Sequence, residues 1–304
     1  MTGQPRPPTR SPRPGAPTPG PGPIRSVLVG EPGPLTTLQD EGRPGWAGIG
    51  VGRSGACDLA SYRLANRLVG NRPGTAALEV TFGGLVMHAE ADVTVVTTGA
   101  RCPGAPHQGP VRLRAGESLR LGPPGAGLRT YLAVRGGFDV HPVLGSRASD
   151  VLGGIGPAPL AAGDRLTIGD QVDGFPCVDL AAVPDPAPDL LTVSVTEGPR
   201  LDWFDEAAWH LLTTQTYTVS SQSNRVGVRL DGAALGRGRE GELPSEGMLR
   251  GALQVPPSGL PVLFLADHPV TGGYPVVGYV DDDDVDRCAQ LRPGQRLRLR
   301  TGSR

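Results

Sequence analysis

The sequence predicts a mainly β protein built from two tandem β-barrel lobes with a few short helices. Two observations favour this class: short apolar runs recur between glycine and proline turns, and the two halves of the chain resemble each other. The chain has 304 residues, of which 46 are Gly and 33 are Pro. This length suits two domains of ordinary size, and small all-β lobes usually close into barrels or sandwiches.

The predicted strands are short runs rich in Val, Thr and Leu that lie between turn residues. Runs of this length and composition are typical of β-strands. The clearest of them cover residues 26–29, 93–97, 131–134, 192–195, 216–219, 261–265 and 276–280.

Helices are predicted at three places. The clearest is 58–69, where Asp58 can cap the N-terminus and Gly70 can end the helix. Two weaker helices are expected at 204–212 and at 284–291, the second with acidic residues at its start.

The two halves share three weak sequence matches in the same order. Each match has a strand-like run beside Gly, and the offsets between partners are similar, so the pattern suggests a tandem duplication. We therefore expect one lobe over 24–187 and a second over 188–304, joined by the Pro-rich stretch 181–190. The matched segments are 27–34 with 193–199, 79–85 with 246–253, and 116–121 with 294–299.

Residues 1–23 are composed mostly of Pro, Gly, Arg and Thr. Such a segment cannot bury enough apolar surface to offset the entropy lost on ordering. We expect a disordered tail.

The 29 basic residues are all arginine. Without lysine the chain has no Walker A motif, no Schiff-base chemistry and no attachment point for biotin or lipoyl groups. The net charge of −1 gives no general attraction to nucleic acids or anionic membranes.

The four cysteines are far apart and form no CxxC pair. No signal peptide is recognisable, and no apolar run approaches the ~20 residues that a membrane-spanning helix needs. We expect a cytoplasmic protein with free thiols.

Two motifs resemble ligand sites. Residues 50–55 read GVGRSG before the first predicted helix, but no strand precedes them as a dinucleotide site requires. The loop suits an anion at a helix N-terminus, or it is purely structural. The acidic run 281–284 lacks the Gly and Glu of an EF-hand loop, so no metal site is predicted.

Polar residues gather in several glycine-rich loops, where function is often found. Arg147 and Arg225 could bind a carboxylate or phosphate through two hydrogen bonds. Asn224, Gln254 and Tyr274 could orient an amide. The alternative is that these residues form turns and buried hydrogen bonds to the backbone.

Nine ordered motifs in the chain resemble one family, which comprises the C subunit of bacterial 5-oxoprolinase and is also called the Kip antagonist or allophanate hydrolase subunit 2 family. The same unit forms part of the carboxyltransferase domain of urea carboxylase. The resemblance runs from about residue 24 to about residue 300. The motifs lie at 36–45, 54–58, 65–71, 77–84, 98–100, 144–147, 223–227, 254–256 and 271–275.

This resemblance implies two cyclophilin-like β-barrel lobes, which are carboxyltransferase subdomains A and B. The implied activity is ATP-dependent opening of 5-oxo-L-proline to L-glutamate, in a complex with the B and A subunits of 5-oxoprolinase. ATP is expected to bind with the partner subunit, and biotin only on another protein.

The chemistry that the resemblance implies suggests roles for the polar residues, which we state as a hypothesis. Arg225, Asn224 and Asp58 are expected to be catalytic, and Asp40 or Asp58 to be structural or to carry a proton. The expected substrate-binding residues are Arg147, Gln254, Thr271, Tyr274, Ser54 and Ser245.

Two further functions stay open: a carboxyltransferase component that uses biotin on another protein, and a non-enzymatic antagonist of a kinase-inhibitor partner. The chain departs from the family pattern at Val226, at Ala148 and at His268-Pro269. The last pair lies just before the motif at 271–275, which contains the expected substrate-binding residues Thr271 and Tyr274. It therefore bears on the identity of the substrate.

Overall fold

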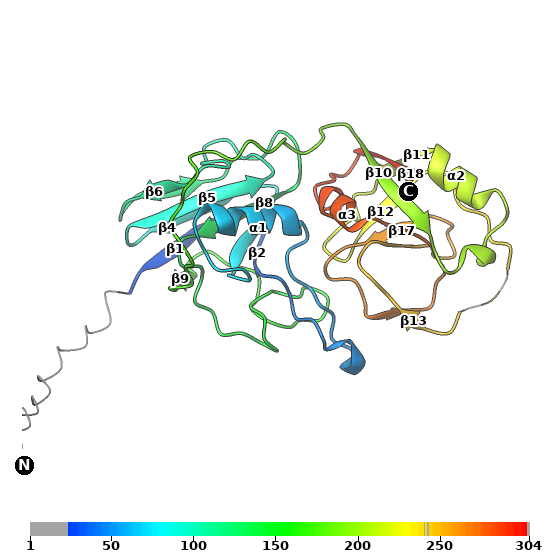
Figure 1. Ribbon diagram of the computed structural model, residues 1–304, viewed down its shortest axis with the longest axis horizontal. Helices are drawn as coiled ribbons and strands as arrows, with labels where there is room; N and C mark the ends of the chain where they lie inside the picture. The colour runs from blue at the N-terminus through cyan, green and yellow to red at the C-terminus, as the bar shows by residue number, and fades with distance from the viewer. Residues whose placement is uncertain (1–23, 240, 242, 303–304) are drawn as a thin grey trace, which may run out of the picture.

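The computed structural model describes residues 24–239, 241 and 243–302. The expected tail at 1–23 lies outside the described residues. Two lobes lie side by side, and one extended segment joins them (Figure 1). None of the helices in the described part is long and apolar enough to cross a membrane.

The first lobe contains two antiparallel sheets that enclose one core. The sheets have the strand orders β7-β4-β1-β9 and β2-β3-β8-β5-β6. The elements of this lobe are β1 (Ser26–Pro32), β2 (Leu35–Gln39), η1 (Ala47–Ile49), α1 (Leu59–Leu68), β3 (Ala77–Thr81), β4 (Leu85–Ala89), β5 (Val93–Gly99), β6 (Val111–Leu113), β7 (Ser118–Arg120), β8 (Arg129–Val134) and β9 (Arg165–Thr167).

The second lobe is a closed barrel with the strand order β10-β17-β14-β15-β12-β11-β18. The parallel pairing of β10 with β18 closes it, from Leu190 opposite Arg296 to Val195 opposite Thr301. Its elements are β10 (Leu190–Glu197), η2 (Leu201–Trp203), α2 (Ala208–Thr214), β11 (Thr216–Val219), β12 (Gly227–Asp231), β13 (Glu246–Gly247), β14 (Ala252–Gln254), β15 (Val262–Phe264), β16 (Thr271–Gly272), β17 (Val276–Val280), α3 (Asp282–Cys288) and β18 (Arg296–Thr301).

The mainly β, two-lobed fold class is therefore confirmed, but the lobes differ in closure. In the first lobe Val29 and Met87 of one sheet and Leu78 and Leu132 of the other share one buried core. This is the packing of a sandwich, in which the inner faces of two sheets interdigitate. The expected boundary at 187/188 stays a prediction, although β10 begins close to it.

The three predicted helices are present. Asp58 caps α1 by accepting a 2.9 Å hydrogen bond from the Ser61 amide, and Gly70 follows the helix with φ +68°. The expected start of the third helix at Asp284 was wrong, because α3 begins at Asp282. Asp284 instead accepts a hydrogen bond from the backbone of Ser194 in β10.

One residue of the first lobe belongs to the core of the second. Cys57, just before α1, is fully buried among Leu253, Val277 and Val285 of the barrel. The lobes are thus joined by apolar packing as well as by the chain.

We predict that a native chain exposes one of its four thiols to an aromatic disulfide reagent, and all four after denaturation. Cys57, Cys102 and Cys288 are buried, whereas Cys177 is exposed. Burial also raises the pKa of Cys57 to about 11, and the thiolate is the reactive form. A Cys177→Ala variant is expected to lose the fast reaction, and fast labelling of that variant would contradict this packing.

Candidate functional site

Two cavities lie between the lobes. The smaller one, called here the glycine-loop cavity, has a volume of about 420 Å³. The larger one, the linker cavity, has about 520 Å³ and lies between α1, α3 and residues 183–187. Both lobes line the glycine-loop cavity, the first with Gly50, Gly52 and Asp150 and the second with Asp267, His268 and Thr271.

A buried ion-pair network beside the glycine-loop cavity joins the lobes. Arg225 of the second lobe is 3% exposed. Its Nε donates to Asp267 Oδ2 at 2.8 Å and its Nη2 to Asp267 Oδ1 at 3.0 Å. Nη2 also donates to the Gly55 carbonyl at 2.7 Å, and Nη1 pairs with Glu79 of the first lobe. All three guanidinium nitrogens are therefore engaged by protein oxygens.

Glu79 is the centre of this network on the side of the first lobe. Its Oε2 accepts hydrogen bonds from the Cys57 amide at 2.9 Å and the Tyr131 hydroxyl at 2.7 Å. Burial by itself would raise the pKa of Glu79, but Arg225 and Arg129 outweigh it and hold that pKa below its usual value. The carboxylate is therefore charged, as its two cationic neighbours require.

These contacts involve Arg225, which was expected to be catalytic together with its neighbour Asn224. The contacts of Arg225 favour a role in joining the lobes, since each of its nitrogens already donates to the protein. Asn224 is exposed, and its Oδ1 accepts a 2.8 Å hydrogen bond from the Val226 amide in a turn. The catalytic assignment of both residues stays a prediction.

Ser54 fixes one wall of the glycine-loop cavity. It is buried with φ +54°, and its hydroxyl donates to Asp267 Oδ1 at 2.6 Å. The Val151 amide donates to Asp267 Oδ2 at 3.1 Å. Asp267 therefore ties three segments of the two lobes together at the cavity.

Four predicted binding residues lie along the β13–β16 ribbon and its neighbour β14. Thr271 is exposed and lines the glycine-loop cavity. Gln254 is buried and its Nε2 donates to the Tyr274 carbonyl at 3.2 Å. The Tyr274 side chain is 41% exposed, and Ser245 is exposed directly before β13. Of these four residues, Thr271 lines the glycine-loop cavity, whereas Gln254, Tyr274 and Ser245 lie outside its wall.

Arg147 is engaged elsewhere. Its Nε donates to the Val140 carbonyl at 2.7 Å, and its amide donates to Asp40 Oδ2 at 2.6 Å. Asp40 also accepts from the Ser146 hydroxyl at 2.6 Å. These bonds favour the structural alternative for Asp40, which holds the loop that carries Arg147.

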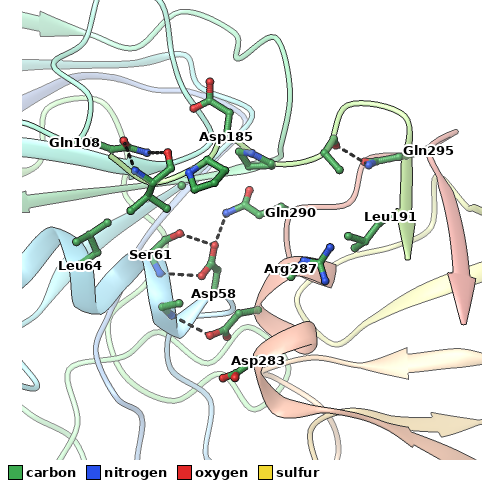
Figure 2. A pocket seen from close by; sticks show the side chains of 17 residues that line it. Asp58, Ser61, Leu64, Gln108, Asp185, Leu191, Asp283, Arg287, Gln290 and Gln295 are labelled. Atoms are coloured by element: carbon green, nitrogen blue, oxygen red, sulfur yellow. Dashed lines mark hydrogen bonds between the residues drawn. The ribbon is translucent and has the colours of Figure 1, made fainter. Parts of the chain in front are cut away.

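Asp58 lines the linker cavity (Figure 2). Its carboxylate accepts hydrogen bonds from the Ser61 hydroxyl at 2.7 Å and from Gln290 Nε2 at 2.7 Å. Burial, followed by the nearby charge of Asp286, raises the pKa of Asp58 to about 6. Thr271 and Asp58 therefore line different cavities, so the expected site residues are divided between two places.

Besides Asp267, two polar residues that sequence reasoning did not assign lie in the wall of the glycine-loop cavity together with Thr271. They are Asp150 and His268. The His268 ring stacks on Phe264, and its Nδ1 lies 2.8 Å from the Pro269 carbonyl. Both residues had a signal in the sequence, since Asp150 ends a polar glycine-rich cluster and His268 departs from the family pattern.

Fold and site together define a two-lobed β protein with ligand-sized cavities between its lobes. Residues 49–301 match the family described as "Carboxyltransferase domain, subdomain A and B". The chain belongs to this family, which confirms the resemblance found in the sequence motifs.

The relatives fall into two groups. The chain is 37% identical to the C subunit of the Escherichia coli 5-oxoprolinase over 278 residues, which cover 87% of each protein. It is 32% identical to the urea amidolyase of Saccharomyces cerevisiae over 90% of this chain but only 16% of that protein.

Solved structures agree in fold. The urea carboxylase of Kluyveromyces lactis superposes with a TM-score of 0.84 at 28% identity, over 91% of this chain and 27% of that one. The protein TTHA0988 gives a TM-score of 0.81 at 35% identity, over 96% of this chain. The chain spans 60% of the length of that solved protein.

We predict that Glu79→Gln lowers the free energy of unfolding by about 3–5 kcal/mol, because it leaves two buried guanidinium groups without their shared carboxylate. Urea denaturation measures this change. Glu90→Gln is the matched control, since Glu90 pairs with Arg165 at the surface and exposed pairs contribute little. Equal, small effects of the two variants would contradict the role given to the buried network.

Proposed function

We propose that the chain is the C-type subunit of a cytoplasmic, ATP-dependent 5-oxoprolinase that converts 5-oxo-L-proline to L-glutamate. The observation that carries this proposal is the match to the C subunit of the E. coli 5-oxoprolinase across 87% of both proteins. The corresponding 5-oxoprolinase subunit of Haemophilus influenzae is 31% identical over 86% of this chain. The urea amidolyases, by contrast, are much longer than this chain.

The glycine-loop cavity is the proposed place of the lactam. Both lobes contribute to it, and its volume of about 420 Å³ suits a small molecule. Asp150, His268 and Thr271 supply hydrogen-bonding groups, while Gly50 and Gly52 let the backbone approach a ligand closely. A lactam needs such groups, because its N–H and carbonyl must be oriented for ring opening. No arginine in the described part of this wall can pair with the carboxylate of 5-oxo-L-proline, so we place that carboxylate on the backbone amides of the glycine loop.

The charges of the cavity walls support the placing of ATP on a partner subunit. Among the described residues, no basic side chain other than the half-buried His268 lines the glycine-loop cavity, and the linker cavity places one arginine, Arg287, among four aspartates. A triphosphate needs cationic groups or free backbone amides around it. We therefore propose that a partner subunit holds ATP, in keeping with the absence of lysine.

The proposed partners are the B and A subunits of the same enzyme. The name of the E. coli relative, which is that of a subunit, supports a complex. Exposed apolar side chains near the glycine-loop cavity, among them Trp46, Ile49 and Leu152, offer a surface to such a partner. The complex would then cover the mouth of the cavity that contains the lactam.

The second candidate is a carboxyltransferase component that uses biotin on another protein. The description of the matched family and the likeness to urea amidolyase favour it. Inhibition by avidin of a reconstituted complex would support this candidate against the first.

We predict that the chain together with the A and B subunits forms glutamate from 5-oxo-L-proline and ATP, and that the chain alone forms none. The reason is that neither cavity is suited to ATP. Glutamate is measured by a coupled dehydrogenase assay, with complexes that lack one component as controls. Absence of glutamate from the full complex would overturn the proposed function.

We predict that Gly52→Val raises the KM for 5-oxo-L-proline in that complex roughly tenfold, by filling the cavity. A Cβ at Gly52 would lie 3.5 Å from the His268 carbonyl, an ordinary contact that the fold tolerates. Gly48→Val is the matched control, because a Cβ at Gly48 meets nothing within 4 Å. A KM unchanged by both variants would place the substrate elsewhere.

A further inference from the structure

We propose that Asp150 is the acceptor that binds the amide N–H of the substrate in the glycine-loop cavity, and that the buried Arg43 positions it. The inference rests on the proposed function and names the residue that distinguishes an amide from an ester. Neither residue was among the site residues expected from the sequence.

The two carboxylates of the cavity differ in how far their oxygens are occupied. Asp267 accepts from Ser54, from Val151 and twice from Arg225, so both of its oxygens are saturated by the protein. Within the described part of the chain, Asp150 accepts one hydrogen bond, through Oδ1 from the Gly153 amide at 2.7 Å. Its Oδ2 is therefore the carboxylate oxygen left for a ligand.

Oδ2 lies against glycines that line the cavity, since a Cβ built at Gly153 would lie 2.8 Å from it. A Cβ built at Gly52 would lie 4.0 Å from Asp150 Oδ2 and 3.5 Å from the His268 carbonyl on the second lobe. Gly52, Asp150 and His268 all line the cavity. The free oxygen thus lies at the wall of the cavity, beside the glycine loop that faces the second lobe.

Arg43 is the cationic neighbour of Asp150. Its side chain is 0% exposed, and Nη2 donates to the Ala148 carbonyl. Its Nη1 lies 3.9 Å from Asp150 Oδ2, and Nε and Nη1 make no hydrogen bond within the described residues. A buried guanidinium requires a nearby anion, and at this distance the cation attracts Oδ2 without occupying its lone pairs.

His268 supplies a second acceptor. A carbonyl can only accept, so the contact with Pro269 assigns the proton to Nδ1 and leaves Nε2 as the acceptor of the neutral ring. Burial lowers the pKa of His268, which favours that neutral form. Two side-chain acceptors, Asp150 Oδ2 and His268 Nε2, therefore belong to one cavity, and acceptors are matched by ligands that carry N–H groups.

The test compares a lactam with a lactone in the complex with the A and B subunits. The probes are 5-oxo-L-proline and its analogue in which a ring oxygen replaces N–H. Asp150→Asn is expected to lower kcat/KM for the lactam roughly 10- to 100-fold, the usual worth of a hydrogen bond to a charged group. The inhibition constant of the lactone is expected to stay the same or to fall, because the lactone has no N–H to lose.

Two further variants separate recognition from structure. Arg43→Lys keeps the cation but moves its charge. It is expected to lower kcat/KM for the lactam relative to the affinity for the lactone, which is the preference for lactam over lactone, and to do so by less than Asp150→Asn does. Asp164→Asn is the matched control, because Asp164 accepts from the Ala161 amide three residues away and does not line the cavity. It is expected to leave the preference unchanged.

Each outcome decides the proposal. Equal weakening of lactam and lactone by Asp150→Asn would assign Asp150 to the fold alone and overturn the inference. Full lactam turnover by that variant would overturn it as well, while leaving the proposed function intact. A wild-type complex that forms no glutamate would overturn the proposed function, and the inference with it.

Discussion

The structure depends on the charge network that Arg225, Glu79 and Asp267 form between the lobes. Removing three charges from water is unfavourable unless each is paired and hydrogen-bonded. Here each charged group finds partners from both lobes, among them the Gly55 carbonyl and the Cys57 amide of the first lobe. Such a network is satisfied in one arrangement of the lobes and not in others. Its contribution is therefore to fix their relative position, more than to add net stability.

The cavities follow from that arrangement. On one side Asp267 supports Ser54 and the Val151 backbone and gives the glycine-loop cavity its shape. On the other side α1 and α3 are held together because Asp286 of α3 accepts hydrogen bonds from the Leu59 and Ala60 amides at 2.9 Å each. A carboxylate at a helix N-terminus is favourable for the helix dipole as well. Hydrogen bonds between the two lobes therefore lie beside both cavities.

In this chain without lysine, arginine side chains join separate segments of the structure. A planar guanidinium can serve several acceptors at once, which lysine cannot do with one compact ammonium group. Arg225 contacts three residues, and Arg292 reaches the carbonyls of Pro124, Gly125 and Gly127. These contacts join separate segments of the protein, and they favour the same role for Arg225, which was expected to hold an anion.

Local patterns in the sequence predicted seven of the strands, the three helices, the cap at Asp58 and the family, because these depend on neighbouring residues and on ordered motifs. The shorter strands, such as β6 and β13, carry too few residues to show a pattern. The tertiary structure alone decided which polar residues face a cavity. Arg225 meets Glu79 across 146 positions and Ser54 meets Asp267 across 213, and no local pattern contains such pairs. Arg225 and Asp150 look alike in sequence, as charged residues in glycine-rich loops. They differ only in how many of their polar atoms the folded protein has already occupied, since buried polar groups without a protein partner are the ones left to bind a ligand.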